Sequence, residues 1–477
     1  MIEGYIQQKD RKNILLLCDD IRMHSGIATM AREFVLNTAH HYNWFNLGAA
    51  IQHPDLGKII DLSSDMNKRH NIDDADVIVL PSNGYGDATT IRNILKTRDI
   101  DAIMIFTDPR YWTWLFEIER EVRSQVPIVW YNIWDDYPAP LYNKDYYRSV
   151  DTLLAISKQT KNINEIVLGE YAEDKILEFV PHGIDEKIFY PINPSDKDFL
   201  KFKKETLKGK DFDFIAFFNS RNISRKHPHD LVLGYRLFCD KIGKEAAKKC
   251  GLIMHTQVVD QHGTDLKALK EALCDPSYVN IMFSSNKLTA PQLNCLYNMA
   301  DVTVLPSSNE GWGLSLTESM MAGTMIAANV TGGMQDQMRF EDENGNWVNF
   351  SKDFPSNHRG TIKQCGEWAI PIFPSNISLQ GSPATPYIYD DRCSPEDIAE
   401  ALYKSYSMDV ADRLENGLKG REWALSEESG FTSQRMTQGI MNGIDKTIEK
   451  FAPRTPFDLI EVKPKEPRYV EHKLTGY

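Results

Sequence analysis

Hydrophobic residues are arranged along the chain as short apolar runs that alternate with amphipathic segments. The first run, 13–18, reads N-I-L-L-L-C, and the segment that begins at Gly26 carries apolar residues at helical spacing. Short apolar runs are typical of strands that are buried on both faces of a parallel sheet. Further strands are predicted over 77–80, 102–106, 128–130 and 152–156, with a helix over 111–122. This alternation predicts an α/β fold with a doubly wound parallel sheet.

A second series of strands begins after a polar, lysine-rich stretch, 191–210. We interpret this stretch as the linker between two domains. The strands of the second series are predicted over 212–218, 252–256, 279–283, 302–305 and 324–328. The sequence thus predicts two Rossmann-like domains, over 1–195 and 196–430. Ligands of such sheets bind beyond the carboxyl ends of the strands, so we expect the site in the cleft between the domains.

The composition is that of an ordinary soluble protein, with 42% hydrophobic and 25% charged residues. The chain has 477 residues, which is more than one hydrophobic core usually supports and also indicates two domains. A net charge of −13 argues against a generally basic, phosphate-binding surface. It excludes neither a local basic cleft nor a nucleic-acid partner.

Neither a membrane span nor a disulfide framework is expected. No apolar run reaches the roughly 18 residues that a span needs, and 1–11 is polar, unlike a signal peptide. The seven cysteines form no C-x-x-C pair, which favours reduced thiols over disulfides or a zinc site. We therefore expect a cytoplasmic protein with no transmembrane segment.

The most informative segment is 307–323, which reads S-S-N-E-G-W-G-L-S-L-T-E-S-M-M-A-G. It follows the apolar run 301–306, so Glu310 is expected at the carboxyl end of a strand and Glu318 inside the next helix. The glycines beside Glu310 would let the backbone approach a ligand closely, and the amides at the start of the helix form an anion site. These features favour binding of a sugar diphosphate.

Within this segment, E-G-W-G-L-S-L-T-E-S-M-M-A-G resembles the E-G-F-G-L-x-x-x-E-A-M-A-x-G signature of the family 4 retaining glycosyltransferases of the GT-B fold. The resemblance implies two Rossmann-like domains that face a central cleft. It also implies that 431–477 contains a helix that crosses back to the first domain, followed by a tail. The implied enzyme is a retaining, metal-independent hexosyl- or pentosyltransferase that uses a nucleotide-diphosphate sugar and no cofactor. The leaving phosphate, rather than a protein nucleophile, would assist front-side attack by the acceptor.

The resemblance assigns roles to the residues of this motif. Glu318 would bind the ribose hydroxyls of the nucleotide, since a carboxylate is the usual partner of vicinal hydroxyls in such folds. Glu310 would orient the donor sugar together with the backbone amides that follow it. The predicted donor-binding set is completed by Gly26, Gly311, Trp312, Gly313 and Leu314.

Two cations, Arg221 and Lys226, resemble the Arg-x4-Lys pair of the family and follow the strand predicted over 212–218. They would neutralise the diphosphate leaving group, whose charge grows as the glycosidic bond breaks. Arg225 could share this role. The alternative is a solvated basic loop. With Glu310, Arg221 and Lys226 form the predicted catalytic set, and no metal site is expected because the chain lacks a supported Asp-x-Asp pair.

One departure from the family concerns contacts with the sugar and the acceptor. Many relatives have I-H-D after the strand near 128–130, whereas this chain has I-W-D, with Trp134 in place of the histidine. Asp135 or Asp136 either binds a sugar hydroxyl or caps a turn before the next proline. His182, in the family-like element P-H-G-I-D, could present its ring or its amide to the cleft. Trp134, Asp135 and His182 are predicted as acceptor or sugar contacts.

The region 344–391 is rich in Trp, Pro, Gly and Ser and is longer than a usual connection. It is either an edge extension that packs its aromatic side chains or a specificity insert near the cleft. We favour the edge extension.

The predicted function is transfer of a sugar from a nucleotide-diphosphate sugar to an unidentified acceptor hydroxyl. The acceptor is open among a glycan, a small molecule, a protein and a modified DNA base. A nucleic-acid acceptor is not favoured, because Trp112 and Trp114 pack more simply into the first domain than onto bases. The alternatives are a sugar phosphorylase, a nucleotide-sugar epimerase, or a catalytically silent nucleotide-sugar-binding scaffold, the last being consistent with the missing histidine.

Overall fold

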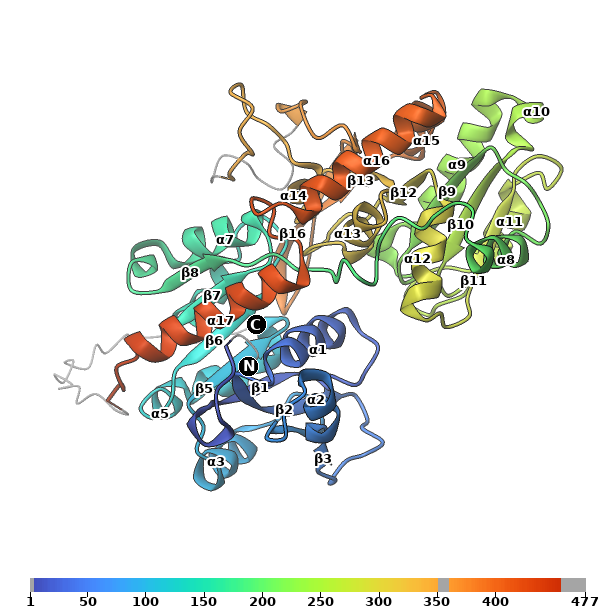
Figure 1. Cartoon of the computed structure of the whole chain (residues 1–477). Coiled ribbons are helices and arrows are strands. Elements are labelled where there is room, and N and C mark those ends of the chain that lie inside the picture. The colour runs from blue at the N-terminus through green and yellow to red at the C-terminus, as the bar shows by residue number, and fades with distance from the viewer. Residues whose placement is uncertain (1–3, 351–359, 456–477) are drawn as a thin grey trace, which may run out of the picture.

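The computed structural model describes residues 4–350 and 360–455 and contains two parallel sheets flanked by helices (Figure 1). The strands of the first sheet, in spatial order, are β3 (Ile60–Asp61), β4 (Val77–Asn83), β2 (Tyr42–Ala50), β1 (Lys12–Asp19), β5 (Ala102–Phe106), β6 (Ile128–Asn132), β7 (Thr152–Ala155) and β8 (Ile176–Phe179). Only the edge strand β3 runs antiparallel to its neighbour.

The second sheet is parallel throughout. Its strands, in spatial order, are β11 (Ile281–Ser284), β10 (Cys250–His255), β9 (Phe214–Asn219), β12 (Val302–Leu305), β13 (Met325–Asn329) and β14 (Ala369–Ile372). An antiparallel hairpin, β15 (Asn376–Ser382) and β16 (Thr385–Arg392), stands apart from both sheets. The two parallel sheets confirm the predicted fold class, an α/β protein with two Rossmann-like domains.

Helices connect the strands within each domain. Those of the first part of the chain are α1 (Gly26–Thr38), α2 (Ser63–His70), α3 (Ala88–Thr97), α4 (Thr113–Glu117), α5 (Glu119–Val122), α6 (Lys144–Arg148) and α7 (Lys158–Leu168). The later ones are α8 (Lys197–Thr206), α9 (Pro228–Ile242), α10 (Lys244–Ala247), α11 (Leu266–Leu273), α12 (Ala290–Met299), α13 (Leu314–Met321), α14 (Met334–Met338), α15 (Pro395–Tyr406), α16 (Val410–Leu425) and α17 (Ser433–Lys450). None of the described helices combines the length and hydrophobicity needed to cross a bilayer.

Each predicted strand is present, but β2 was not predicted because asparagines interrupt its apolar pattern. Asn46 is only 1% exposed, and its amide group bonds to the backbone of neighbouring segments. Its Nδ2 donates to the carbonyl of Leu16 at 3.2 Å, and its Oδ1 accepts from the amide of Ile21 at 3.1 Å. These bonds satisfy the buried amide, so the polar residue is tolerated inside a sheet.

Local structure differs from the prediction in two places. The helix predicted over 111–122 is divided into a 3₁₀ turn, Pro109–Trp112, and the short helices α4 and α5. The stretch 191–210 does lie between the two sheets, but α8 forms half of it and its start is bonded to α12. The amide of Ile192 donates to Asn298 Oδ1 at 2.7 Å, and that of Tyr190 donates to Asn294 Oδ1 at 3.2 Å.

The chain crosses between the domains twice, and the two crossings lie side by side. Ile184 in the first crossing and Thr432 in the second form a parallel bridge. The amide of Ile184 donates to the carbonyl of Phe431 at 2.9 Å, and the amide of Ser433 donates to the carbonyl of Ile184 at 3.0 Å. The second crossing leads into α17, which returns to the first domain and packs against β7, β8 and α1 (Figure 1).

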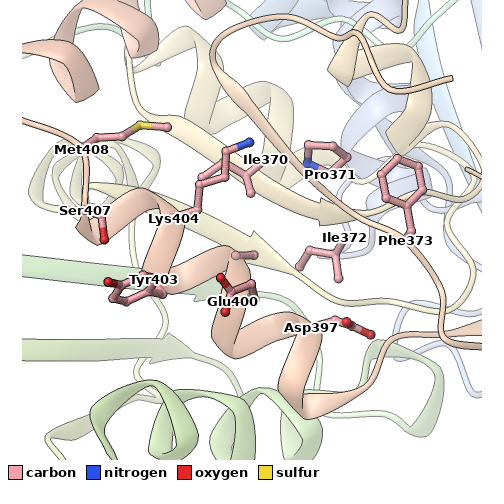
Figure 2. A pocket seen from close by; sticks show the side chains of 11 residues that line it. Ile370, Pro371, Ile372, Phe373, Asp397, Glu400, Tyr403, Lys404, Ser407 and Met408 are labelled. Atoms are coloured by element: carbon pink, nitrogen blue, oxygen red, sulfur yellow. The ribbon is translucent and has the colours of Figure 1, made fainter. Parts of the chain in front are cut away.

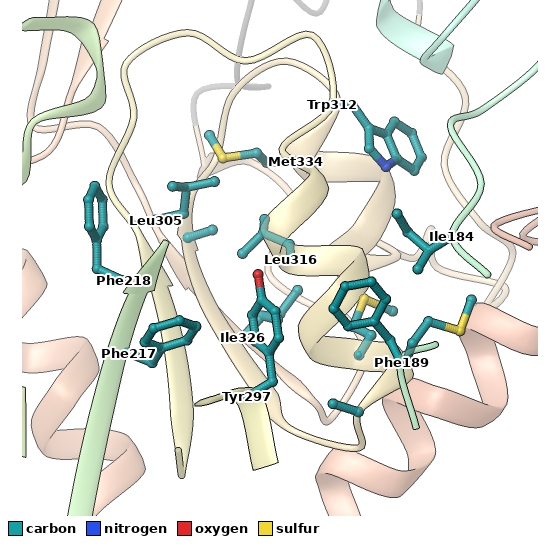
Figure 3. Packing of buried hydrophobic residues seen from close by; sticks show 14 of the residues in the cluster. Ile184, Phe189, Phe217, Phe218, Tyr297, Leu305, Trp312, Leu316, Ile326 and Met334 are labelled. Atoms are coloured by element: carbon teal, nitrogen blue, oxygen red, sulfur yellow. The ribbon is translucent and has the colours of Figure 1, made fainter. Parts of the chain in front are cut away.

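Apolar side chains of the crossings close the core around α13 (Figure 3). Phe189 of the first crossing packs edge-on against Tyr297, with ring centroids 5.9 Å apart. Trp312 packs edge-on against Phe431 of the second crossing, with centroids 4.9 Å apart. The helix that carries Glu318 is therefore held by both connections between the domains.

Gly183 makes the double crossing possible, since a Cβ there would lie 2.2 Å from the carbonyl oxygen of Thr432. We expect Gly183→Ala to lower the free energy of unfolding by about 3 kcal/mol, because backbone on the opposite side cannot give way. Gly209→Ala is the control: Gly209 has a positive φ of 73° but open space around it. That change should cost only about 1 kcal/mol of backbone strain. Chemical denaturation of both variants is the measurement, and equal losses would contradict the role of Gly183.

Candidate active site

Glu310 follows β12 and is a buried carboxylate, with the residue only 6% exposed. Lys226 Nζ donates to its Oε1, and Ser307 Oγ donates to the same oxygen at 3.0 Å. Arg225 Nη1 lies 3.6 Å from its Oε2. Two cations from the loop after β9 therefore meet a carboxylate from the loop after β12, at the carboxyl edge of the second sheet.

The pKa values of Glu310 and Lys226 depend on each other and on the charge of Arg225. Burial by itself would raise the pKa of Glu310, but the charges of Lys226 and Arg225 outweigh burial and hold that pKa below its ordinary value. Burial, with Arg225 adding to it, lowers the pKa of Lys226 to about 8 in spite of the neighbouring carboxylate. Lys226 therefore remains a cation at neutral pH but loses its proton under mildly alkaline conditions.

Glu318 projects from α13 and is half-buried beside two polar groups from other elements. The hydroxyl of Tyr297 in α12 donates to Oε2 at 2.5 Å, and Nδ2 of Asn219 at the end of β9 lies 3.5 Å from the same oxygen. Burial raises the pKa of Glu318 to about 7, although the bond from Tyr297 opposes the rise. No described residue donates a hydrogen bond to the other carboxylate oxygen, Oε1, so this is the oxygen that a ligand hydroxyl could approach.

Of the two arginines after β9, the structure brings Arg225 rather than Arg221 to Glu310. The side chain of Arg221 is 58% exposed and pairs with Asp260 at 3.0 Å. Arg225 instead donates to the carbonyl of Asn309 at 2.5 Å. Spacing along the sequence could not decide between the two, because Arg225 lies within the 3₁₀ turn Ser224–Lys226 and Arg221 lies before it.

The glycines of the motif are required by the backbone conformation and by close packing between backbone segments. Gly313 caps α13 with a φ of +86°, which an L side chain rarely adopts. A Cβ at Gly311 would lie 2.7 Å from Ile156 Cδ1 and 3.0 Å from the carbonyl oxygen of Ile133, both in the first domain. Gly311 is thus required where the two domains touch.

Trp312 and Gly26 also lie at this junction. The indole of Trp312 is 2% exposed and donates from Nε1 to Thr317 Oγ1 at 2.9 Å, so only its backbone is available to a ligand. A Cβ at Gly26 would lie 3.8 Å from Leu314 Cδ1. The first turn of α1 therefore faces the first turn of α13 across the cleft.

Two of the side chains predicted as sugar or acceptor contacts are enclosed by the protein. Trp134 is 7% exposed, and its Nε1 donates to the carbonyl of Asp136 at 2.9 Å. His182 is 5% exposed, its Nδ1 lies 2.9 Å from the hydroxyl of Tyr131, and burial lowers its pKa to about 3. The ring of Trp134 is bonded to the backbone of its own turn, and the neutral ring of His182 is buried beside Tyr131. Neither ring is well placed to contact a ligand.

Asp135 and Asp136, by contrast, lie with the charged groups of the second domain. Burial raises the pKa of both carboxyl groups, and that of Asp136 is raised further by Asp135. Arg225 attracts both of them, and Asn309 Nδ2 donates to Asp136 Oδ1. Asn309 lies within the motif, although nothing in its pattern singles this residue out, and it joins the loop of Glu310 to the first domain.

The region 344–391 is more than an edge extension. Its strand β14 does extend the second sheet, but the hairpin β15–β16 reaches the first domain. The amide of Tyr389 donates to the carbonyl of Tyr137 at 2.6 Å, and its carbonyl accepts from Asn309 Nδ2 at 2.8 Å. Arg110 Nη1 donates to Thr385 Oγ1 at 2.7 Å. The hairpin therefore borders the cleft, as the alternative interpretation of this region requires; residues 351–359 lie outside the described part.

Two further features lie outside the groups around Glu310 and Glu318. Within the described residues, one group has the composition of a metal site, namely His227, His229 and Asp230. Arg392 donates to both oxygens of Asp230 at 3.0 Å, which already balances the carboxylate. A pocket of about 530 Å³ lies between β14 and α15 and is lined by residues such as Phe373 and Lys404 (Figure 2). None of its lining residues belongs to the groups around Glu310 and Glu318.

Comparisons with known proteins agree with this architecture. Residues 279–354 match the family described as Glycosyl transferases group 1. The chain is 23% identical over 190 residues to mannosylfructose-phosphate synthase of Agrobacterium fabrum, a match that spans 39% of each chain.

Solved structures similar to the whole fold include three from bacteria. A glycosyltransferase from Rickettsia africae has a TM-score of 0.63 and 14% identity, with 92% of this chain and 100% of that one covered. Sucrose-phosphate synthase from Thermosynechococcus elongatus has a TM-score of 0.62 and 13% identity, with 92% and 100% covered. The Anabaena protein HepE, in complex with UDP and glucose, has a TM-score of 0.61 and 13% identity, with 91% and 100% covered. The chain is thus a protein of the GT-B fold that carries, in its second domain, the segment shared by the group 1 glycosyltransferases.

Proposed function

We propose that the protein is a retaining glycosyltransferase that moves a sugar from a nucleotide-diphosphate sugar to an acceptor hydroxyl. The observation that carries the proposal is the group formed by Glu310, Lys226 and Arg225 at the carboxyl edge of the second sheet, with Glu318 on the adjoining helix. The match to the group 1 glycosyltransferases and the similarity to a protein bound to UDP and glucose support it.

In this proposal Glu318 binds the nucleotide through its ribose. Its free carboxylate oxygen accepts hydrogen bonds from the vicinal hydroxyls, while Tyr297 holds the other oxygen at 2.5 Å. A carboxylate that is already fixed by one protein donor loses little further freedom when the ligand binds.

Lys226 and Arg225 bind the diphosphate. They pair with Glu310 in the structure, and the diphosphate would draw them toward itself while Glu310 turns to the hydroxyls of the donor sugar. The first amides of α13, beyond Gly313, add partial positive charge at the same place. These groups stabilise the negative charge that develops on the leaving oxygen, which is how a site with cations accelerates such a reaction.

The chemical step needs no protein nucleophile. The bond between the anomeric carbon and the diphosphate oxygen breaks, and a new bond to the acceptor oxygen forms on the same face of the sugar. The acceptor proton passes to a phosphate oxygen of the leaving group. The contribution of the protein is therefore to orient both substrates and to neutralise charge, with no metal in the proposed mechanism.

The first test is binding of nucleotides. We expect one nucleoside diphosphate or nucleotide sugar from a panel to raise the melting temperature of the wild type, and Glu318→Ala to weaken that ligand about tenfold to hundredfold, the value of a hydrogen bond to a charged group. Glu415→Ala, on the exposed face of α16, is the matched control and should bind normally. If no nucleotide binds the wild type, the transferase proposal fails; binding without donor turnover would favour the silent scaffold.

The pH dependence of nucleotide affinity provides a second test. Glu318, with a pKa raised to about 7, must be ionised to accept both hydroxyl donors, so affinity should fall as the pH drops below about 7. Lys226, with a pKa lowered to about 8, must be protonated, so affinity should also fall above about pH 8. In both the acid and the alkaline limb of the profile, nucleotide affinity should approach about a tenfold change per pH unit. Calorimetric titration across pH would measure it, and Glu318→Gln should remove only the acid limb. A flat profile in the wild type would contradict both assignments.

The third test separates the two arginines. Arg225→Ala should lower kcat by about 10²-fold to 10³-fold, the cost of one lost group that stabilises charge in the transition state. Arg221→Ala, on the same loop, should cost much less because its side chain is exposed and pairs with Asp260. Steady-state kinetics of donor consumption would compare them. A larger loss in Arg221→Ala would restore the pairing implied by the family pattern.

A further inference from the structure

The loops that follow the strands of the first sheet form the other side of the cleft. They contact the donor side at several points: Ile133 lies against Gly311, Gly26 lies against Leu314, and Asp136 accepts from Asn309. In a transferase whose donor binds to the second domain, this side receives the acceptor. The inference therefore rests on the proposed function and concerns the chemical class of the acceptor.

These loops are rich in carboxylates at the edge of the sheet. Asp19 ends β1, Asp108 follows β5, and Asp135 and Asp136 follow β6. Asp20, next to Asp19, is fully buried. Arg110 and Arg22 pair with Asp108 and Asp20 and are more exposed than these carboxylates, so an anion that approaches this edge meets ion pairs rather than free cations.

The basic side chains of the same loops are already engaged. Arg22 pairs with Asp20 at 2.7 Å and with Asp55 at 3.1 Å, and Arg110 pairs with Asp108 at 2.5 Å. The other basic groups among the described residues of the loops after β1, β2 and β4 to β7 are His24, His53 and Lys58. His53 Nε2 lies 2.9 Å from Asp20 Oδ2, and Lys58 pairs with Asp55 at 2.9 Å. Lys158, the first residue of α7, has its Nζ 3.5 Å from the ring centre of Trp347 and donates to Val348.

Beyond the groups assigned to the diphosphate, the second domain brings Lys287 to this side. Its Nζ donates to Nε2 of His24 at 2.5 Å, so the ammonium is hydrogen-bonded but keeps its charge. A phosphate group on the acceptor would have to take a guanidinium or an ammonium from its present partner. Removing Arg22 from Asp20 would leave a fully buried carboxylate without its guanidinium and with His53 Nε2, 2.9 Å away, as its remaining basic partner, which is unfavourable.

The same edge offers the groups that bind an uncharged sugar. Tyr111 is 50% exposed and stacks on Tyr85, with ring centroids 4.5 Å apart and 26° between the planes. The hydroxyl of Tyr85 donates to Asp19 Oδ1 at 2.6 Å, and Ser25 donates to Asp19 Oδ2. An aromatic face packs against the C–H face of a sugar, and nearby carboxylates accept hydrogen bonds from its hydroxyl groups.

We propose that the acceptor group that enters the cleft is an uncharged polyhydroxyl compound, such as an unphosphorylated sugar, and not a sugar phosphate. The aromatic face of Tyr111 and the carboxylates of Asp19 and Asp108 bind it. In this respect the chain differs from the relatives named sucrose-phosphate synthase and mannosylfructose-phosphate synthase, in spite of the shared fold.

The test compares matched acceptor pairs: glucose with glucose 6-phosphate, fructose with fructose 6-phosphate, and mannose with mannose 6-phosphate. Full-length protein is first saturated with the nucleotide that binds in the thermal-shift panel, and donor consumption and further thermal stabilisation are then measured for each pair. We expect the neutral member to be favoured at least about tenfold. A phosphorylated member that is favoured, or that equals its neutral partner, overturns the inference.

A variant at Asp108 provides a second test of the selectivity between neutral and phosphorylated acceptors. Asp108→Asn removes the carboxylate that holds Arg110 and should shift selectivity toward the phosphorylated member by about tenfold, because one guanidinium becomes available to phosphate. Asp145→Asn is the control, since it removes the carboxylate beside Arg148 at an exposed position; it should leave selectivity unchanged. An equal shift in both variants overturns the assignment of Arg110 and Asp108.

Absence of nucleotide binding by the wild type would refute the proposed function itself. If nucleotide binds but the phosphorylated acceptor is preferred, only this inference is refuted.

Discussion

A buried carboxylate that must be balanced by cations is the constraint on which the rest of the candidate site depends. Glu310 lies under the loop 331–333, where a Cβ at Gly332 would lie 2.0 Å from its carbonyl oxygen and the amide of Gly333 donates to that oxygen at 3.0 Å. The backbone therefore cannot move the carboxylate into solvent without breaking this turn. An unpaired charge at such a position is strongly destabilising, so the carboxylate requires cations beside it. The 3₁₀ turn before α9 contains these cations, Lys226 and Arg225. The same requirement makes these cations available, at a fixed place, to a competing anion.

The second consequence is that the site belongs to both domains. Asn309, one residue before Glu310, is bonded to Asp136 in the first domain and to the carbonyl of Tyr389 in the hairpin. Gly311, one residue after it, touches the loop after β6. A displacement of the loop that carries Glu310 would therefore also disturb the contacts between the two domains. The double crossing at Ile184 and Thr432 limits that movement, because two backbone segments must shift together.

The sequence predicted the fold well because both sheets are built from apolar runs that are buried on two faces. It failed where a tertiary contact overrides the local pattern: Asn46 is buried in β2 because the protein supplies its hydrogen bonds, and the lysine-rich stretch forms α8 because Phe199 is buried. Around the site, the motif located Glu310 and Glu318, but the partner of Glu318, Tyr297, comes from another helix and carries no signal of its own. Spacing also could not distinguish Arg221 from Arg225, since that choice depends on side-chain direction.

The division of charge across the cleft follows from this arrangement. Cations lie on the loops of the second sheet, where a diphosphate would bring negative charge, and several carboxylates lie on the loops of the first. Arg225 lies beside Glu310 and attracts Asp135 and Asp136 as well. A diphosphate that draws Arg225 toward itself would leave the two aspartates with less positive charge nearby, and they would hold a proton more firmly. Protonated carboxyl groups can donate as well as accept hydrogen bonds, and a sugar hydroxyl can pair with them in either sense. The donor would thereby set the protonation of the surface on which the acceptor binds.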